Sequence, residues 1–549
     1  MTIREKIRNL LIQAIKRSGF VVDFDISLDA SGQEIHGDYA ANAALILAKK
    51  LNQDPLLVAE KIKTAVLKAG SGIFEKVEVA GPGFLNFFLS KDYVQKQIGE
   101  ILREGNKYGS LKIGKSKKVQ VEFISANPTG PLTIGNGRGG FWGDVLANTL
   151  TKAGFRVEKA YYVNDYGNQI MALGHSVLKD GEAKYKGDYI DWLNKEVKEK
   201  DPYRAGERAA KLIIKKLIEK TVAKMGIKFD EWISETWLHK TKRVDKALAI
   251  LKRKKFLYEE EDALWFRSTT FGDQRDRVVV KRNEWKTYLA GDAGLHYYKF
   301  SEKKFAKVIN IWGADHWGDA PGLQGVVEAL GHKGKLEILF HQFITLFKGG
   351  QELRMSKRAG VYVTMDELLE MAGRDATRFF FLQKAAGTHL NFDVDQAKEQ
   401  SAKNPVYYVQ YAHARISSII KKLKIQNSRL RASSAEAAAK AGQGFGGQAK
   451  SKITYQKLKL LNHQSELALI KQLIRLPEVV EDTAKDYQVQ RLPQYALDLA
   501  TSFHQFYRDC RVITEDKNLA KARLALILAT KIVLKNTLDL MGITAPERM

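Results

Sequence analysis

The strongest constraint on the fold is a series of short apolar segments that alternate with helical patterns between residues 116 and 400. Residues 119–124 are a candidate strand, residues 141–153 a helix that ends before Gly154, and residues 157–163 the next strand. Residues 308–312 form another short apolar run, which is followed by glycine. Strand, helix and strand in this order predict a parallel sheet with right-handed crossovers. We therefore expect a Rossmann-like, doubly wound α/β domain at residues 116–400.

The segments on either side of this domain follow different patterns. Residues 1–115 begin with apolar side chains at helical spacing and later alternate around the turn Gly81-Pro82-Gly83, which predicts a small α+β domain. Residues 401–549 carry apolar side chains at i, i+3 and i+4, most clearly at 524–541, which predicts an all-α bundle. Residues 428–451 are rich in Ala, Gly, Ser, Gln and Lys. We expect a flexible insertion there, with transient helix at 435–441.

Composition narrows the partners and the compartment. The formal net charge is +26 with basic residues along the whole chain, which suits a polyanion partner or a general solubility bias. Cys510 is the only cysteine, so the chain can form no internal disulfide and no Cys-rich zinc site, and we expect a reducing cytoplasm. No apolar run reaches the roughly 18 residues that a membrane span requires, so we expect no membrane segment.

Two glycine motifs match nucleotide-binding patterns. Residues 109–116 satisfy the phosphate-loop pattern, but a strand-like segment follows where a helix should begin, so we interpret the match as chance. Residues 135–140 satisfy the G-x-G-x-x-G pattern, with Asp165 at the end of the next strand, which makes a dinucleotide-dependent oxidoreductase a rival hypothesis. That fold needs glycine directly after the strand, whereas residues 125–134, including Pro128 and Pro131, intervene here.

The same segment suits a different nucleotide site. The loop 125–136 leaves a predicted strand and enters a helix N-terminus, where free N–H groups and the helix dipole favour phosphate. Gly135 lets a ligand approach the backbone closely, and Thr133 and Asn136 can donate hydrogen bonds to a phosphate whose charge grows as a leaving group departs. An ordinary turn with polar caps would contain the same residue types.

A second segment, residues 353–360, follows a predicted hairpin with its turn at residues 348–351. Lys357 on this loop can move onto the phosphates of ATP and neutralise them in the transition state. Met-Ser-Lys alone is a common tripeptide. Its place after a hairpin, downstream of the first loop in the same domain, makes the pair of segments much more specific.

The two segments resemble the paired signatures, known as HIGH and KMSKS, of class I aminoacyl-tRNA synthetases. The first is Thr133-Ile134-Gly135-Asn136 here, and the second is Arg354-Met355-Ser356-Lys357-Arg358. The surrounding sequence is similar to arginyl-tRNA synthetases in particular, over nearly the whole chain. This similarity is carried by residues 36–40, 121–132, 162–169, 311–316, 404–415 and 545–549.

The resemblance implies an enzyme that uses ATP, as its Mg²⁺ complex, to activate arginine before loading it onto arginine tRNA. It implies an ATP site made by Thr133, Gly135, Asn136, Gly137, Met355 and Lys357, with catalytic roles for Thr133, Asn136, Ser356 and Lys357. The α-amino and carboxylate end of arginine would lie against Glu122, Ser125 and Asn127. Its guanidinium would face Tyr288 and Asp292. Asp315, next to His316 at the end of a later strand, would also belong to the arginine site. We expect no protein-bound metal, no zinc and a monomeric enzyme.

The resemblance also implies how tRNA is bound. The helical bundle would bind the anticodon region through Tyr407, Tyr411 and Arg415, and residues 1–115 would touch the tRNA elbow. Aromatic rings beside basic side chains are typical of surfaces that stack unpaired bases. Any one of these tyrosines is equally compatible with a place in the core of the bundle.

Two features keep alternatives open. The family usually has histidine at both ends of the first signature, whereas this chain has Thr133 and Asn136, a form that resembles tryptophanyl-tRNA synthetases. A tRNA-binding homologue with weakened or absent catalysis is therefore a rival hypothesis. Considered alone, Glu122 and Asp292 would also be compatible with ordinary surface ion pairs.

Overall fold

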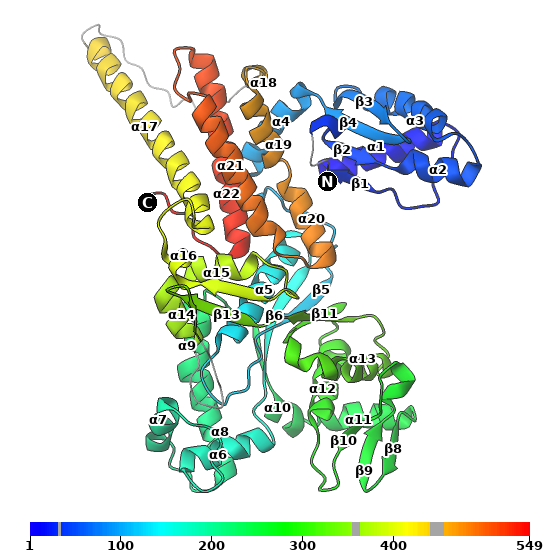
Figure 1. Cartoon of the computed structure of the whole chain (residues 1–549), viewed down its shortest axis with the longest axis vertical. Helices are drawn as coiled ribbons and strands as arrows, with labels where there is room; N and C mark the ends of the chain where they lie inside the picture. Colours follow the sequence, from blue (N-terminus) through cyan, green and yellow to red (C-terminus); the bar gives the residue numbers. More distant parts are fainter. Residues whose placement is uncertain (31–33, 354–362, 440–454) are drawn as a thin grey trace.

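The computed structural model describes residues 1–30, 34–353, 363–439 and 455–549. In Figure 1 the N-terminal α+β region and the C-terminal helices occupy one end of the long axis, the parallel sheet lies near the middle, and its insertions occupy the other end. This arrangement confirms the predicted fold class: a Rossmann-like parallel sheet with an α+β N-terminal region and an all-α C-terminal part.

The N-terminal region is a four-stranded antiparallel sheet with helices packed on it. The strand order is β1 (Leu28–Ala30), β2 (Tyr39–Ala41), β4 (Phe84–Leu89), β3 (Phe74–Ala80). The last two strands form the hairpin expected around Gly81-Pro82-Gly83, and Ala80 pairs with Phe84. The helices are α1 (Ile3–Arg17), α2 (Ala43–Leu51) and α3 (Pro55–Ala69); α4 (Lys91–Glu104) leads from this region to the C-terminal helices.

The central sheet has five parallel strands in the order β12 (Leu336–His341), β11 (Lys307–Gly313), β5 (Lys118–Glu122), β6 (Arg156–Val163), β7 (Glu231–Ser234). The strands expected at 119–124, 157–163 and 308–312 are therefore confirmed. The crossover helix α5 (Ile134–Lys152) starts earlier than the expected 141–153. Its first half is rich in glycine, which obscures the apolar periodicity. The strand order reverses between β5 and β11, so the loops that follow these two strands diverge at their carboxyl ends.

Two insertions follow β6 and β7. The first consists of α6 (Asn168–Leu178), α7 (Asp188–Glu196), α8 (Pro202–Ile213) and α9 (Glu219–Lys224). The second consists of α10 (Glu235–Lys240), α11 (Arg243–Arg253), and the antiparallel strands β8 (Leu257–Glu260), β9 (Ala263–Phe266) and β10 (Arg277–Val280). It ends with α12 (Tyr288–Tyr297), which continues directly into a π-helical turn, Tyr298–Glu302. The helix α13 (Ala320–Ala329) then joins β11 to β12.

A small mixed sheet lies beyond the edge of the central sheet. Its strand order is β14 (Gln351–Glu352), β13 (Ile344–Lys348), β15 (Leu390–Asp393). The hairpin predicted at residues 348–351 is the pair β13 and β14, in which Lys348 lies opposite Gln351. The helices α14 (Met365–Ala372), α15 (Arg374–Leu382) and α16 (Val394–Lys398) complete this part of the molecule.

The C-terminal part is entirely helical in the residues that the structure describes. It comprises α17 (Pro405–Ala439), α18 (Tyr455–Leu458), α19 (Gln464–Leu473), α20 (Leu476–Asp486), α21 (Arg491–Asp509) and α22 (Lys517–Met541). The expected flexible insertion at 428–451 begins inside α17, so its first residues are helical, in keeping with their alanine content. Residues 440–454 lie outside the described residues.

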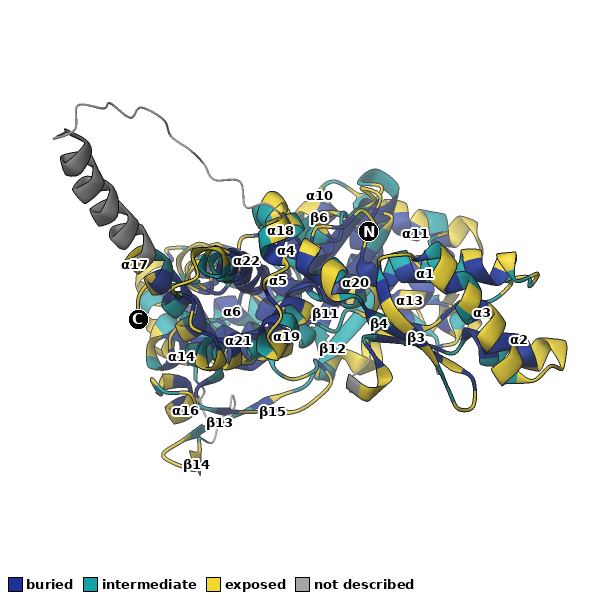
Figure 2. Ribbon diagram, turned by 90° about the horizontal axis from the view of Figure 1, so that it is seen from above, coloured by how far each residue is buried: buried dark blue, intermediate teal, exposed yellow. Residues whose placement is uncertain are grey.

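The N-terminal and C-terminal parts contact each other directly through charged groups. Arg4 of α1 donates hydrogen bonds to Glu481 and Asp482 of α20, and the Tyr39 hydroxyl donates to Glu478 at 2.7 Å. Figure 2 shows buried residues running through the interior, with exposed residues on the outer helices. Within the described segments, no helix is long and apolar enough to cross a membrane.

Candidate active site

A cavity of about 1580 Å³ lies at the carboxyl ends of β5, β6 and β11, where the strand order reverses. Open α/β sheets bind ligands at such an edge because the loops diverge there. Its lining contains ten residues singled out from the sequence: Glu122, Ser125, Asn127, Thr133, Gly135, Asn136, Tyr288, Asp292, Asp315 and His316. Met355, Ser356 and Lys357, with the rest of the second signature, lie outside the described residues.

Unusual backbone geometry turns the chain from β5 into the cavity. Ile124 and Ser125 have φ angles of 67° and 38°, in the left-handed region that a β-branched residue such as isoleucine avoids. The Ser125 hydroxyl donates to Glu122 Oε1 at 3.3 Å and accepts from the Tyr162 N–H at 3.0 Å. The Tyr161 hydroxyl donates to the Ala126 carbonyl at 2.9 Å. Strain that neighbouring groups hold in place in this way is common at functional sites.

The first signature forms the N-terminus of α5. Thr133 is the N-cap residue, and Asn136 Oδ1 accepts hydrogen bonds from both the backbone N–H and the hydroxyl of Thr133 at 2.9 Å. The Asn136 Nδ2 group therefore has no hydrogen-bond partner within the described residues. A Cβ atom at Gly135 would meet only Thr133 Oγ1, at 3.7 Å, so the backbone there is open to a ligand. A helix N-terminus with free donors favours an anion.

The chain returns to this helix N-terminus directly after residues 354–362. Thr364 forms an antiparallel bridge with Thr133, and the Met365 N–H donates to the Leu132 carbonyl at 2.8 Å. Val363 lines the cavity. Gly137 is not part of the lining: it faces Met365, whose Sδ would lie 2.2 Å from a Cβ built on Gly137. The chain that follows the second signature thus lies against the first signature.

Another part of the lining is acidic. Asp292 projects from α12, and no hydrogen bond or ion pair joins its carboxylate to a described residue. Burial, followed by the charges of Glu122 and Glu235, raises the pKa of Asp292 to about 8. Burial also raises the pKa of Glu235, whose Oε2 atom has no hydrogen-bond partner in the described structure. A desolvated carboxylate without a partner, such as that of Asp292, favours a cationic ligand, and a guanidinium supplies matching donors.

Two aromatic groups flank these carboxylates. Burial and the neighbouring carboxylates raise the pKa of Tyr162 well above its ordinary value, so this lining hydroxyl stays protonated. Tyr288, at the start of α12, is 60% exposed, so its ring is accessible to a ligand. Sequence reasoning had singled out Tyr288 but not Tyr162 or Glu235, because no spacing in the chain marks the latter two as neighbours of Asp292.

Glu122 is not the surface ion pair considered from the sequence. Its carboxylate is buried at the end of β5 and pairs with the ammonium group of Lys299, whose side chain is completely buried. Burying an ion pair costs more free energy than a surface pair does, so this geometry needs an explanation other than stability.

Polar side chains also follow β11 and β12. Asp315 and His316 begin a short 3-10 turn after β11, and His316 Nδ1 lies 3.5 Å from Asp319 Oδ2. Their side chains are exposed to the cavity, as open-sheet sites require. His341, at the end of β12, lines the cavity as well, and burial lowers its pKa to about 4, so it is neutral. Its position at a strand end is the signal that could have revealed it.

A buried arginine lies one turn into α5. Arg138 donates hydrogen bonds to four carbonyl oxygens, those of Gln342, Phe343, Ala385 and Thr388, at 2.9, 3.2, 3.0 and 2.5 Å. No carboxylate pairs with it within the described residues. Burial lowers the pKa of Arg138 to about 10, so it remains charged at neutral pH. It fixes the start of α5 against the loops that flank β13 and β15.

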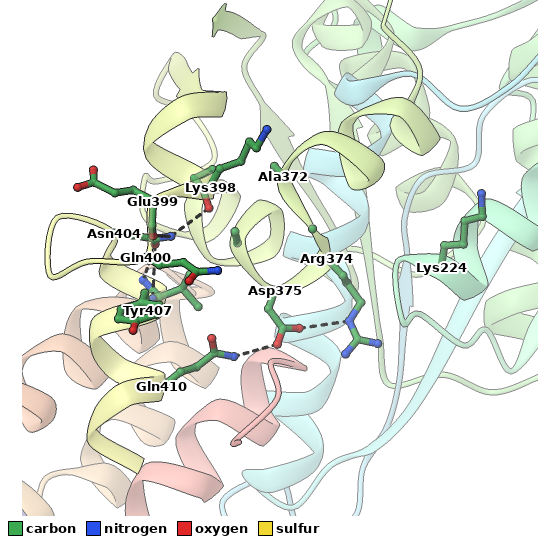
Figure 3. A pocket seen from close by; sticks show the side chains of 14 residues that line it. Lys224, Ala372, Arg374, Asp375, Lys398, Glu399, Gln400, Asn404, Tyr407 and Gln410 are labelled. Carbon is green, nitrogen blue, oxygen red and sulfur yellow. Dashed lines mark hydrogen bonds and ion pairs between the residues drawn. The ribbon is translucent and has the colours of Figure 1, made fainter. Parts of the chain in front are cut away.

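The residues expected to bind tRNA lie together on α17, away from the cavity. The rings of Tyr407 and Tyr411 are stacked with centroids 6.2 Å apart, and Arg415 Nη1 donates to the Tyr411 hydroxyl at 2.6 Å. Tyr407 also lines a separate hollow of about 600 Å³ between α15, α16 and α17 (Figure 3). There Asp375 accepts a hydrogen bond from Gln410 at 2.9 Å, which joins α15 to the foot of α17.

The structure accounts for both glycine motifs. Residues 109–116 form turns before β5 and no helix follows them, so the phosphate-loop match is a coincidence. Residues 135–140 lie inside α5, well beyond the end of β5, and not in a tight turn after the strand. A Cβ atom at Gly140 would lie 2.9 Å from Ile124, and one at Gly143 would lie 2.3 Å from Phe123. These glycines let α5 pack closely on the chain that leaves β5.

A cavity that joins a helix-terminal signature to an acidic pocket, at the switch point of a parallel sheet, defines a class I aminoacyl-tRNA synthetase. The family model described as the catalytic domain of class I (R) tRNA synthetases matches residues 97–189 and 189–421. The arginyl-tRNA synthetase N-terminal domain model matches residues 2–89, and the DALR anticodon-binding domain model matches residues 409–549. The chain belongs to the arginyl-tRNA synthetase family.

Full-length relatives agree with this assignment. The arginine–tRNA ligase of Moorella thermoacetica is 41% identical, over 96% of this chain and 94% of its own length. That of Bacillus subtilis is 38% identical over 100% of both chains. The solved structure of Thermus thermophilus arginyl-tRNA synthetase has a TM-score of 0.75 over 100% of both chains at 21% identity, which supports the same fold.

Proposed function

We propose that this chain is an arginine–tRNA ligase that activates arginine with ATP in the cavity at the carboxyl ends of β5, β6 and β11. The observation that carries the proposal is that one cavity contains both a desolvated carboxylate cluster and an open helix N-terminus. The first suits the cationic side chain of arginine and the second suits the phosphates of ATP. Family membership supports the same reaction.

Arginine would lie between two groups of residues. Asp292 and Tyr288 would face the guanidinium, with Glu235 behind Asp292 adding negative potential. At the other end, the carboxylate of Glu122 is suited to the α-ammonium group, and Ser125 and Asn127 would orient the reacting carboxylate. A cation with two positive ends matches two separate acidic positions, which is the physical basis of the proposed selectivity.

ATP would lie at the start of α5. Thr133, Gly135 and Asn136 would contact its phosphates or ribose, while Gly137 would act indirectly by admitting Met365 beside the helix. Met355, Ser356 and Lys357 are proposed to complete the site from the second signature, because the chain that follows it pairs with Thr133. Mg²⁺ would enter with ATP as part of the substrate. The described residues contain no cluster of acidic, histidine or cysteine side chains suited to a resident metal.

The chemistry needs no side-chain nucleophile. A carboxylate oxygen of arginine forms a bond to the α-phosphorus, the bond to the bridging oxygen breaks, and pyrophosphate leaves with the electron pair. A ribose hydroxyl at the tRNA 3′ end then attacks the arginyl carbonyl and releases AMP. Positioning and electrostatic stabilisation of the phosphates supply most of the acceleration in such reactions. Lys357 is the residue we propose for the charge that develops on the phosphates.

We further propose that tRNA binds along the long axis of the molecule. Residues 401–549 would bind the anticodon region through Tyr407, Tyr411 and Arg415, and residues 1–115 would contact the elbow. The catalytic domain would span 116–400. The net charge of +26 supports a polyanionic partner. We place the enzyme in the cytoplasm, in keeping with its single cysteine, Cys510. We also propose that it is a monomer.

The test is exchange of labelled pyrophosphate into ATP, with arginine as the amino acid and arginine tRNA present. Wild type is expected to exchange with arginine and not with lysine, and Asp292→Asn to lose most of this activity. Asp245→Asn is the matched control, because Asp245 pairs with Lys286 away from the cavity lining. Absence of exchange with any amino acid, together with retained tRNA binding, would favour a non-catalytic tRNA-binding homologue.

A further inference from the structure

Lys299 is a fully buried cation behind the proposed amino-acid site. It lies in the π-helical turn Tyr298–Glu302 that continues α12, and its side chain is 0% exposed. The lining of the cavity does not include it, so it cannot touch a substrate directly. Its ammonium group instead pairs with Oε2 of Glu122, the carboxylate that does reach the cavity.

A chain of hydrogen bonds holds Lys299 in place. Its Nζ atom lies 3.4 Å from Asn310 Oδ1 on β11, and Asn310 Nδ2 donates to His296 Nε2 at 3.3 Å. His296 Nδ1 then donates to the Asp292 carbonyl at 2.9 Å. Burial, with the charge of Lys299, lowers the pKa of His296 well below its ordinary value, so the ring is neutral and can fill both roles. The chain runs from Glu122 back to the residue that faces the guanidinium.

A stability role does not explain this arrangement. A buried ion pair is often no more stabilising than apolar residues of the same volume, because both charges lose their hydration. Lys303, four residues further on, shows the ordinary alternative: it pairs with Glu158 and Glu231 at 3.1 and 3.0 Å while partly exposed. The burial of Lys299 is therefore better explained by its contact with the carboxylate of Glu122.

We propose that Lys299 is a positioning residue that holds the carboxylate of Glu122 oriented to receive the α-ammonium group of the amino acid. Ser125 fixes Oε1 of Glu122 and Lys299 fixes Oε2, which aims the carboxylate at the cavity. Asp292 and Lys299 belong to one continuous helical segment, seven residues apart, or about two turns. One segment therefore sets the separation of the two positive ends of the substrate. The inference rests on the proposed arginine site.

The surrounding charges make the consequence of losing Lys299 clear. Asp292 of α12 and Tyr162 of β6 lie within reach of the Glu122 charge, and Glu235 of α10 acts on Asp292. Asn310 of β11 and His296 of α12 continue the hydrogen-bond chain from Lys299. The carboxylates dominate this set, and the histidine is neutral. Without Lys299 the Glu122 carboxylate loses the cation that holds its Oε2 atom, so the contact with Ser125 no longer suffices to aim it at the cavity.

The test compares two arginine analogues as inhibitors of arginine-dependent pyrophosphate exchange, with tRNA present. Agmatine keeps the guanidinium and the amine, whereas 5-guanidinopentanoate keeps the guanidinium and the carboxylate. We expect Lys299→Met to weaken inhibition by agmatine at least about tenfold and inhibition by 5-guanidinopentanoate less than about threefold. Lys303→Met is the matched control and should change neither inhibition constant.

A double variant keeps the test decisive if Lys299→Met folds poorly. The variant Glu122→Gln/Lys299→Met leaves no unpaired charge buried. Compared with Glu122→Gln alone, it should weaken inhibition by agmatine less than about twofold, because Lys299 acts through Glu122. Equal weakening of both analogues by Lys299→Met, or a further large loss in the double variant, would overturn the inference. Lack of arginine-dependent exchange by wild type would instead refute the proposed function.

Discussion

Arginine binding should expel a proton from Asp292. The carboxyl group has a pKa of about 8 in the ligand-free site, because it is buried beside Glu122 and Glu235. A guanidinium accepts no hydrogen bond, so it binds the ionised carboxylate and not the neutral acid. Binding therefore lowers the pKa of Asp292, and the proton that the neutral form carried is released to the buffer.

The size of the effect follows from that pKa. Roughly nine-tenths of Asp292 is protonated at pH 7, so about 0.9 proton should be released per arginine bound, and about 0.5 at pH 8. The apparent association constant should rise nearly tenfold between pH 6 and pH 7 and level off near pH 9. A surface aspartate would give no such dependence in this range, because its ionisation is complete below pH 6.

Titration calorimetry in two buffers with different ionisation enthalpies measures the released proton directly. The wild-type heat should differ between buffers at pH 7, and the difference should be smaller at pH 8. Asp292→Asn should bind arginine weakly and release no proton. Equal heats in both buffers at pH 7, or full proton release by Asp292→Asn, would show that Asp292 does not face the guanidinium in the way proposed.

The same ionisation predicts a cost to stability. Because the folded-state pKa of Asp292 lies above the unfolded value of 3.8, its contribution to the free energy of unfolding falls as pH rises from about 4 to about 8. The limiting slope is about 1.4 kcal/mol per pH unit. Ligand-free Asp292→Asn should therefore gain in melting temperature over wild type as pH rises, and a parallel pH dependence in the two proteins would contradict this.

Three further predictions test other parts of the site. Lys357→Ala should slow arginine-dependent pyrophosphate exchange by orders of magnitude while tRNA affinity in filter binding stays nearly constant; equal losses would argue against its proposed role. Gly137→Ala should lower the unfolding free energy by about 1–3 kcal/mol in thermal melts, because Met365 occupies the space of its Cβ, whereas Gly99→Ala, in open space on α4, should not. Tyr411→Ala should weaken tRNA binding by about 1–3 kcal/mol without changing the KM for arginine; unchanged binding would place Tyr411 outside the interface.

The sheet could be predicted from the sequence because its strands are short, apolar and separated by helical patterns. The strands β5, β6 and β11 lie where the apolar runs predicted them. The start of α5 could not be predicted, since glycines at 135, 137, 139 and 140 have low helix propensity. Three of them, Gly137, Gly139 and Gly140, lie against Met365, His341 and Ile124. The helix there depends on tertiary contacts that no local pattern reveals.

The site divides in the same way. Residues within the two signatures could be named from short contiguous stretches of sequence. The cavity lining includes most of those that the structure describes. Glu235 and Lys299 could not, because each comes from a separate element and meets the other site residues only after the sheet forms. Long-range charge clusters leave no periodic trace in a sequence.

Arg138 places a buried positive charge one turn into α5, the helix whose N-terminus lines the cavity. Its guanidinium is bonded only to carbonyl oxygens, so its positive charge is left without an opposite charge from the described residues. That charge adds to the dipole of α5 and creates a standing positive potential at the helix entrance. The triphosphate of ATP would then act as the counter-ion of this charge. Anions at high salt concentration should weaken nucleotide binding, because they compete for the same position.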